Sequence, residues 1–376
     1  MSRLVIKHNG KIPLISESYN KIGEWPKPYG IGMLVALHNE GGGIKLFLST
    51  DGLTFTYSSI GIYVSTGVGG QYAVDGAFST AINRYVVSTG GPFALGYVIY
   101  TDNFVNWFTA STAFTYQQDS FAISYSPSLD KFVIVGENRP QSSTTGVTWS
   151  LSPYYDINTG NPMQTTWDNI EWIDNLSKFV ATSYTGNPFR VAHSTDGENW
   201  SQFTGGTQSP SGNKASIYSF AYSPTLNRFV GIDPSFATFS YSNDGGYTWS
   251  YITQSSASFS DVSWRGVAYS DDLDLFVAIG LGKTSPYQTN KFAISKTGLT
   301  WSLVYGPTDT WGGRQVIRWS KEFQRFIMFA GNANWTGSSQ YAWSSDGYNW
   351  FTSSCYGDFP ASGNTFGLLS IPNLLI

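Results

Sequence analysis

Ser-Thr-Asp-Gly-Glu-Asn-Trp at residues 194–200 is the clearest copy of a turn motif that recurs along this chain. Each copy, here called a box, runs from a polar turn into Trp or, in the first copy, Phe, at intervals of about fifty residues. A repeat of this length predicts an array of like units that bury their apolar faces only against one another. The boxes are residues 49–55, 101–107, 143–149, 194–200, 242–249, 295–301 and 344–350.

A second motif recurs at about the same spacing as the boxes. Tyr-Ser-Pro-Thr-Leu-Asn-Arg-Phe-Val at 222–230 and its copies are each typical of a strand, a polar turn and a second strand. With the box, the fifth unit is predicted to contain strands at 217–223, 228–232, 237–242 and 248–253. Because such a sheet cannot bury both faces alone, we expect an all-β, seven-bladed β-propeller of four-stranded antiparallel blades.

The two ends of the chain are expected to share one blade. Only a second-strand equivalent, residues 33–37, precedes the first box, whereas residues 366–372 resemble a first strand with no box after it. The C-terminal strand would then close the first blade and remove two exposed sheet edges. We assign the propeller to residues 29–376 and an N-terminal arm or anchor, with two short strands around an Asn-Gly turn, to residues 1–28.

The composition narrows the class of protein. Aromatic residues at 17% and 40 glycines suit tight turns and packed sheets, while charged residues make up only 12%. The single cysteine, Cys355, excludes an internal disulfide, and a net charge of -4 without a basic cluster argues against nucleic acid. Residues 1–10 do not resemble a secretory signal, and no segment is apolar enough to insert into a membrane. We expect no cofactor and no metal site.

The boxes are explained by turn chemistry. A short carboxylate accepts hydrogen bonds from main-chain N–H groups two or three residues ahead, Gly adopts a positive φ, and Trp packs on the adjoining sheet. Thr145 and Thr297 replace the carboxylate in two boxes, which a turn tolerates but a catalytic acid would not. We therefore assign no catalytic residue to the boxes. The expected structural residues are Asp51, Asp102, Asp196, Asp244, Asp346, Trp107, Trp149, Trp200, Trp249, Trp301 and Trp350.

The Ser-x-Asp-x-Gly-x-x-Trp pattern resembles the Asp-box, or BNR, repeats of sialidases and of many non-catalytic bacterial and phage propellers. The resemblance spans about residues 30–376. For a sialidase it implies three arginines that grip a carboxylate, a tyrosine nucleophile with its glutamate, and an aspartic acid/base. Arg84, Arg228 and Arg325 instead occupy equivalent turn positions, and residues 187–190 lack the Ile-Pro of the family's Phe-Arg-Ile-Pro segment. The resemblance therefore favours a non-catalytic member rather than an enzyme.

Ligand binding is the function that the irregular segments favour. Residues 152–162, 205–215, 306–313 and 331–340 are rich in Tyr, Trp, Asn, Ser, Thr and Gly, which suits stacking and hydrogen bonding to sugars. The alternative is that these loops are simply polar surface. We expect Trp311 and Trp335 to contact a ligand.

The innermost strands supply two further candidates. Glu171 and Arg318 are the only charges in one layer of the first strands, and they belong either to a solvated channel wall or to a ligand site. The layer contains Ala77, Ser124, Glu171, Ala221, Ala268, Arg318 and Leu368.

Taken together, these features predict a non-enzymatic structural or host-recognition component of a bacteriophage virion, at the tail. The chain would be made in the host cytoplasm, dock on other virion proteins through residues 1–28 and bind a host surface glycan or receptor. The alternative is an exported bacterial glycan-binding or sialidase-like propeller, in the extracellular space or on the cell surface.

Overall fold

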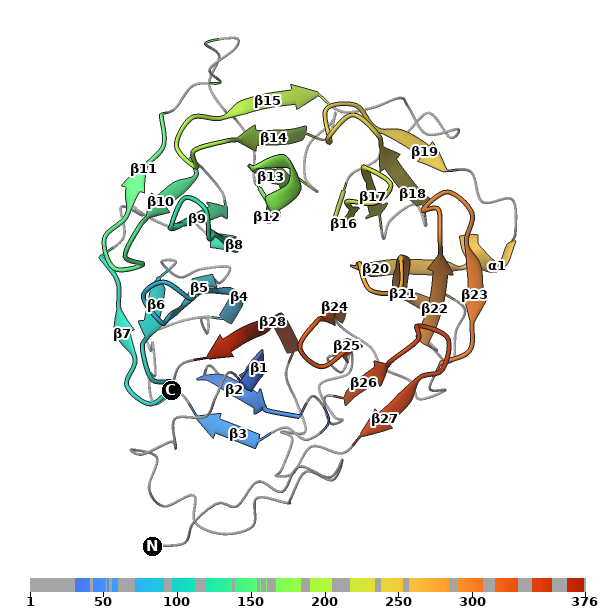
Figure 1. Ribbon diagram of the computed structural model, residues 1–376, viewed down its shortest axis with the longest axis horizontal. Coiled ribbons are helices and arrows are strands. Elements are labelled where there is room, and N and C mark those ends of the chain that lie inside the picture. Colours follow the sequence, from blue (N-terminus) through green and yellow to red (C-terminus); the bar gives the residue numbers. More distant parts are fainter. Residues whose placement is uncertain are drawn as a thin grey trace, which may run out of the picture.

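The computed structural model arranges the chain as sheets around a central opening (Figure 1). Apart from the four-residue helix α1 (Ala257–Ser260) and the 3-10 turn Asp174–Leu176, the regular elements of the described chain are strands, which confirms the all-β propeller prediction. The predicted arm, residues 1–28, lies outside the described residues. The structure describes residues 31–40, 43–51, 53, 56–59, 72–90, 97–111, 120–136, 139–153, 156, 160, 167–183, 190–204, 217–233, 238–252, 257–283, 290–306, 315–330, 340–353 and 364–374.

Six antiparallel four-stranded sheets each take four strands that are consecutive in the chain. The first two contain β4 (Tyr72–Ser79), β5 (Arg84–Gly90), β6 (Val98–Thr101) and β7 (Phe108–Thr109), then β8 (Ser120–Ser126), β9 (Lys131–Gly136), β10 (Gln141–Ser143) and β11 (Ser150–Leu151). The next two contain β12 (Asn169–Ile173), β13 (Lys178–Thr182), β14 (Arg190–Ser194) and β15 (Ser201–Thr204), then β16 (Ser219–Ser223), β17 (Arg228–Asp233), β18 (Thr238–Ser242) and β19 (Ser250–Ile252). The last two contain β20 (Val262–Ser270), β21 (Leu275–Gly282), β22 (Asn290–Ser295) and β23 (Ser302–Val304), then β24 (Gln315–Ser320), β25 (Arg325–Ala330), β26 (Gln340–Ser344) and β27 (Phe351–Ser353).

The remaining sheet joins both ends of the described chain. Its strand order is β28 (Asn364–Leu374), β1 (Ile31–Glu40), β2 (Gly43–Ser49) and β3 (Thr56–Ser59). In the antiparallel register of β1 with β28, Val35 lies opposite Leu369. The segments 33–37 and 366–372, which the sequence singled out, therefore lie on paired strands.

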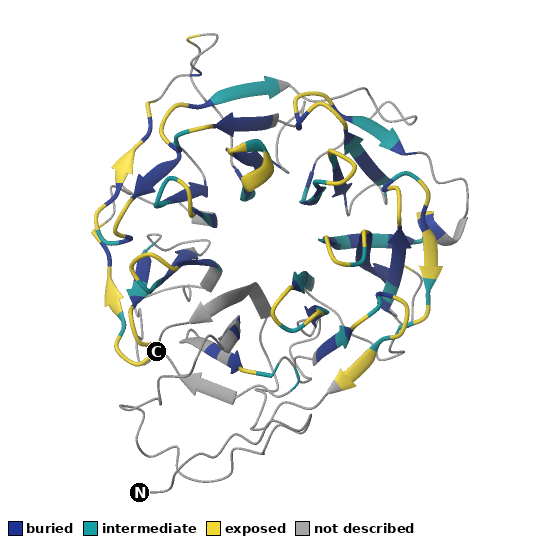
Figure 2. Cartoon of the chain, in the orientation of Figure 1, coloured by how far each residue is buried: buried dark blue, intermediate teal, exposed yellow. Residues whose placement is uncertain are grey.

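The core lies between neighbouring sheets, where the box tryptophans pack. Trp149 joins a buried cluster with Val86 and Val98 of the preceding sheet, and Trp301 stacks on Phe239 of its preceding sheet at 4.3 Å between ring centroids. Burying an aromatic ring of this size contributes about 4–6 kcal/mol of gross transfer free energy. The middle strands are accordingly buried, while the outermost strands that are coloured in Figure 2 are mainly exposed or intermediate.

Candidate functional site

The Asp196 box shows the turn geometry in full. Its Oδ1 accepts the main-chain N–H groups of Glu198 at 2.8 Å and Asn199 at 2.7 Å. The Ser194 hydroxyl oxygen accepts the N–H of Gly197 at 2.8 Å. Partial burial acts to raise the pKa of Asp196, but the hydrogen bonds that its carboxylate accepts from the side chain and main chain of Asn199, from Glu198 and from the Ser194 hydroxyl outweigh it, and the pKa is lowered. The same arrangement recurs at Asp346, whose pKa is also lowered, with partial burial again opposing the bonds.

Threonine makes the same bonds at greater length. The Thr145 hydroxyl accepts the N–H of Val147 at 3.2 Å, and the Thr297 hydroxyl accepts the N–H of Leu299 at 3.2 Å. A neutral oxygen at this distance stabilises the turn less than an ionised carboxylate at 2.8 Å. The turn nevertheless persists in both boxes.

The second box differs from the sequence prediction by one position. Asn103, rather than Asp102, supplies the accepting oxygen, which takes the N–H groups of Val105 at 2.9 Å and Asn106 at 2.8 Å. A carboxamide oxygen can fill this role, and the glycine position that follows is taken by Phe104 at a φ of 57°. The assignment of Asp102 to the turn is therefore corrected to Asn103.

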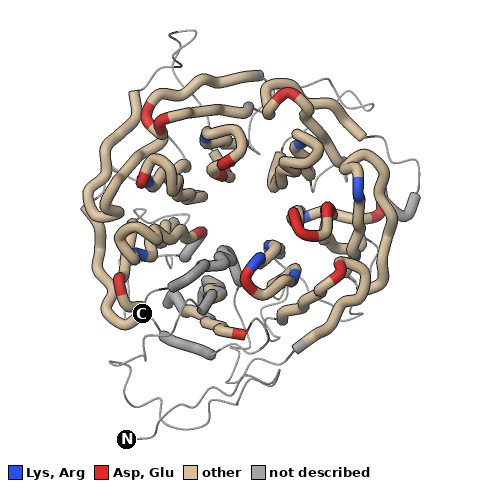
Figure 3. Tube along the Cα trace, in the orientation of Figure 1, with Lys and Arg blue, Asp and Glu red and all other residues tan. Residues whose placement is uncertain are grey.

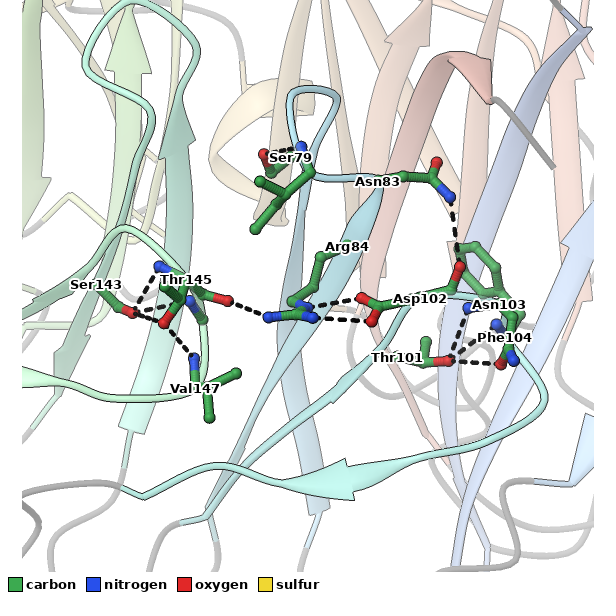
Figure 4. Close-up of polar contacts among 12 residues, drawn as sticks. Ser79, Asn83, Arg84, Thr101, Asp102, Asn103, Phe104, Ser143, Thr145 and Val147 are labelled. Atoms are coloured by element: carbon green, nitrogen blue, oxygen red, sulfur yellow. Dashed lines mark hydrogen bonds and ion pairs between the residues drawn. The ribbon is translucent and has the colours of Figure 1, made fainter.

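Asp102 has a different partner. Its carboxylate forms an ion pair with Arg84 at 2.6 Å, and Arg84 also donates to the main-chain oxygen of Thr145 in the next sheet at 2.7 Å (Figure 4). The hydrogen bond to Asp102, the largest influence, raises the pKa of Arg84.

A cation at the start of the second strand repeatedly binds a box of the next sheet; we call this bond the latch. These latches account for many of the charges that recur at the turns around the opening (Figure 3). They fix adjacent sheets to each other through main-chain oxygens, which every residue type provides. Besides Arg84, the latches run from Lys131 to Asp196 at 2.8 Å, from Lys178 to Gly245 at 2.8 Å, from Arg228 to Thr297 at 2.5 Å and from Arg325 to Asp51 at 3.1 Å.

The structure brings Glu171 and Arg318 together. They lie on β12 and β24, on opposite sides of the central opening (Figure 1), and their side chains form an ion pair. The side chains of Glu171 and Arg318 are 23% and 40% exposed. The charge of Glu171 raises the pKa of Arg318, so the guanidinium stays charged.

Asp75 joins this site and was missed by the sequence analysis. Its Oδ1 accepts the N–H of Gly76 at 2.9 Å and its Oδ2 accepts the N–H of Ile123 at 3.3 Å. Burial raises the pKa of Asp75 to about 6, although the charge of Arg318 opposes the shift. Asp75 precedes Ala77 by two residues on β4 and so shares its face of the strand, which is the signal that could have identified it.

These charges line a cavity of ≈ 260 Å³ at the inner strands β4, β8, β12 and β24. Its charged side chains are Asp75, Glu171 and Arg318, and Phe78 and Tyr125 contribute aromatic wall. A cavity with converging polar groups and apolar walls is suited to a small polar ligand.

The remaining sequence predictions concern loops and metals. Trp311 and Trp335 lie outside the described residues. In the part of the chain that the structure describes, no three His, Cys, Asp or Glu side chains gather in a way that could hold a metal ion. No helix among these residues has the length and apolar character needed to cross a membrane.

Neither a protein-family model nor a curated protein sequence matches the chain. Solved structures do resemble it. An ancestral GH74 enzyme has a TM-score of 0.52 at 16% identity over 81% of this chain and 40% of that one, so this chain spans less than half of that enzyme's length. A protein from Lactobacillus plantarum has a TM-score of 0.59 at 9% identity over 91% and 99% of the two chains. The BP39L lectin from Burkholderia pseudomallei has a TM-score of 0.56 at 14% identity over 88% and 98%. At these identities the likeness establishes the propeller fold alone.

Proposed function

We propose that the ring has seven blades and that β28 closes the first of them. Three observations support this: the seven boxes, the antiparallel pairing of β1 with β28, and the latch from Arg325 in β25 to Asp51 in the first box. The boxes give the number of blades, and the pairing and the latch link the last part of the chain to the first.

Truncation tests the closure. Deleting residues 364–376 removes β28 and should lower the melting temperature by more than about 10 °C, because β1 loses the strand with which it pairs. Deletion of residues 1–12 is the control of similar length. An unchanged melting temperature after the C-terminal deletion would refute the closure.

We further propose that the chain is a non-catalytic propeller of the Asp-box type. The observation that carries this proposal is the latch: Arg84, Arg228 and Arg325 bind main-chain oxygens of the next sheet, and Arg318 is held by Glu171. A sialidase-type site needs arginines directed at a substrate carboxylate. In this chain, three of these arginines join neighbouring sheets and the fourth pairs with Glu171.

We infer that this rigid ring serves as a structural or host-recognition component of a bacteriophage virion, at the tail. A latched propeller holds its connecting loops on a firm scaffold, which suits binding through those loops. The aromatic and polar loop composition, and the fold shared with a lectin, support a host glycan or receptor as the partner. The arm at residues 1–28 would dock on other virion proteins.

Two measurements test this role. Mass spectrometry of purified virus particles should detect the chain, and antibodies against the propeller should label the tail in electron micrographs. The recombinant chain should bind host cells, and a double substitution Trp311→Ala and Trp335→Ala should reduce binding at least tenfold. Absence of the chain from particles would refute the virion role, whereas unchanged binding would refute only these two contact residues.

A sialoside assay tests the non-enzymatic part of the proposal. The protein should release no fluorophore from a fluorogenic sialoside above the rate of a buffer blank. Turnover that is abolished by Arg318→Ala but retained in Arg84→Ala would overturn the proposal and favour an exported glycosidase.

A further inference from the structure

We propose that the central cavity lined by Asp75, Glu171 and Arg318 binds a small organic ammonium ion of about monosaccharide size. This inference goes beyond the proposed function and does not depend on it, because the residues that line the cavity are different from the proposed receptor contacts Trp311 and Trp335.

The dimensions of the cavity set the size of the ligand. Its volume is ≈ 260 Å³. That is somewhat below the roughly 300–1,000 Å³ typical of sites for drug-sized molecules. A single six-membered ring with one or two substituents matches this space.

Among the described residues, the cation of the cavity pairs with Glu171 rather than with Asp75. Arg318 forms its ion pair with Glu171, while the recorded bonds of Asp75 are to the main-chain N–H groups of Gly76 and Ile123. With Asp75 ionised, the lining carries two negative charges and one positive charge. An ammonium group would balance the excess negative charge and gain charge-assisted hydrogen bonds.

Among the described residues, Arg318 is the one cation whose charge acts on Asp75. The charged groups that act on it are Arg318 from β24 and Glu171 from β12. Tyr85 on β5 is buried, which raises its pKa well above the usual value and keeps it neutral. The sequences of β8 and β28 contain no Asp, Glu, Lys, Arg or His. Burial raises the pKa of Asp75 to about 6, because the charge of Arg318 offsets only part of the cost of burying the carboxylate, so Asp75 is ionised at pH 7.5.

The walls favour a cation on a carbon ring over a bare metal ion or an anion. Phe78, Ile123 and Tyr125 offer apolar and aromatic surface, against which ring C–H groups pack. A carboxylate ligand would have to displace Glu171 from Arg318 and would then face the charge of Asp75. Both effects oppose anion binding.

Calorimetric titration of the full chain with trans-4-aminocyclohexanol tests the proposal. This alkyl ammonium ion remains charged between pH 5 and 8, as lysine does. At pH 7.5 we expect saturable binding, at least tenfold tighter than that of the uncharged 1,4-cyclohexanediol. Equal affinities, no binding, or tighter binding of cyclohexanecarboxylate would overturn the proposal.

Substitutions locate the binding. Asp75→Asn should weaken aminocyclohexanol binding at least tenfold, whereas Asp271→Asn, which removes a surface carboxylate paired with Lys321 outside the cavity, should leave it unchanged. Equal weakening by both variants would indicate non-specific attraction of the cation and refute the site.

A pH series on the unaltered protein keeps the test independent of how the variants fold. Because Asp75 is largely protonated below its pKa of about 6, the affinity should fall about tenfold between pH 7.5 and 5. Binding that does not change over this range would overturn the assignment of Asp75.

Discussion

The guanidinium Nη1 of Arg325 lies 3.1 Å from the main-chain oxygen of Asp51, although the two residues are 274 positions apart. The same kind of bond joins Arg84 to Thr145 over 61 positions. Because the acceptor is a main-chain oxygen, the latch is compatible with either Asp or Thr at the box position. At Leu275 the cation is replaced by an apolar side chain, which packs against the glycine of the next box, Gly347.

Exchanging the box residues should change stability in opposite directions. Thr297→Asp should raise the free energy of unfolding by about 0.5–1 kcal/mol, because a carboxylate accepts the turn N–H groups more strongly than a hydroxyl does. Asp196→Thr should lower it by a similar amount, since it loses the bonds at 2.7–2.8 Å. Urea unfolding of both variants measures the difference. A destabilised Thr297→Asp variant would contradict the explanation of the turn.

Alanine at two glycines with positive φ separates backbone strain from steric overlap. Gly160, at φ 69°, has open space where a Cβ would stand, so Gly160→Ala should cost about 1–2 kcal/mol of unfolding free energy from backbone strain alone. At Gly197, φ 75°, the Cβ would lie 2.7 Å from Cγ2 of Val133 in the preceding sheet. Gly197→Ala should therefore cost about 1–3 kcal/mol more. Thermal unfolding measures both costs, and equal losses would show that the inter-sheet contact relaxes.

His193 should make the native protein sensitive to acid. Burial, together with the charge of Lys178, lowers the pKa of His193 to about 3, and its Nε2 is buried without a hydrogen-bond partner. In the unfolded chain His193 therefore binds a proton near pH 6.5, whereas in the native state it stays neutral until the pH falls to about 3. The free energy of unfolding should fall as pH decreases from 6.5 towards 3, by at most about 1.4 kcal/mol per pH unit.

The substitution His193→Tyr tests this pH dependence, because Tyr100 and Tyr241 occupy the equivalent position in two other sheets. The variant should show a flatter decline in unfolding free energy between pH 6.5 and 4, measured by urea denaturation at each pH. Parallel declines in the two proteins would assign the acid sensitivity to other groups.

Asp75 should have the opposite effect on the pH profile. Since burial raises its pKa from 3.8 to about 6, the native state holds the proton more tightly than the unfolded chain, and stability is lost as pH rises through 6. Asp75→Asn removes this loss. Relative to its effect at pH 5, the variant should gain about 1–2 kcal/mol of unfolding free energy at pH 8, with partial exposure reducing the full shift. A gain that is the same at both values of pH would contradict the assignment.

The repeat made the strands predictable because turn residues mark where strands end. The fifth unit was expected to have strands at 217–223 and 228–232, and β16 and β17 occupy Ser219–Ser223 and Arg228–Asp233. The second box was misaligned by one residue, because Asn103 accepts the bonds that a carboxylate accepts elsewhere. Sequence alone could not show that the neighbouring Asp102 is turned toward Arg84.

The candidate site was predictable only in part. Strand alternation placed Glu171 and Arg318 in one layer, but whether two long side chains meet depends on the width of the opening, which no local pattern contains. Asp75 was overlooked because its hydrogen-bond partners are main-chain groups on β4 and β8, which no sequence motif can indicate.

The pairing of β1 with β28 also constrains how the chain can fold. Ile31 lies opposite Leu374, so β1 has no partner on this edge until the ribosome has passed residue 364 and β28 has been synthesised. Bringing the ends of so long a segment together costs about 5 kcal/mol of loop-closure entropy by the logarithmic law, and contacts between distant residues slow folding. Until then, β1 offers unpaired main-chain groups along one edge, to which another nascent chain can add. Premature termination anywhere before residue 364 would therefore leave an aggregation-prone product, however well its completed blades had folded.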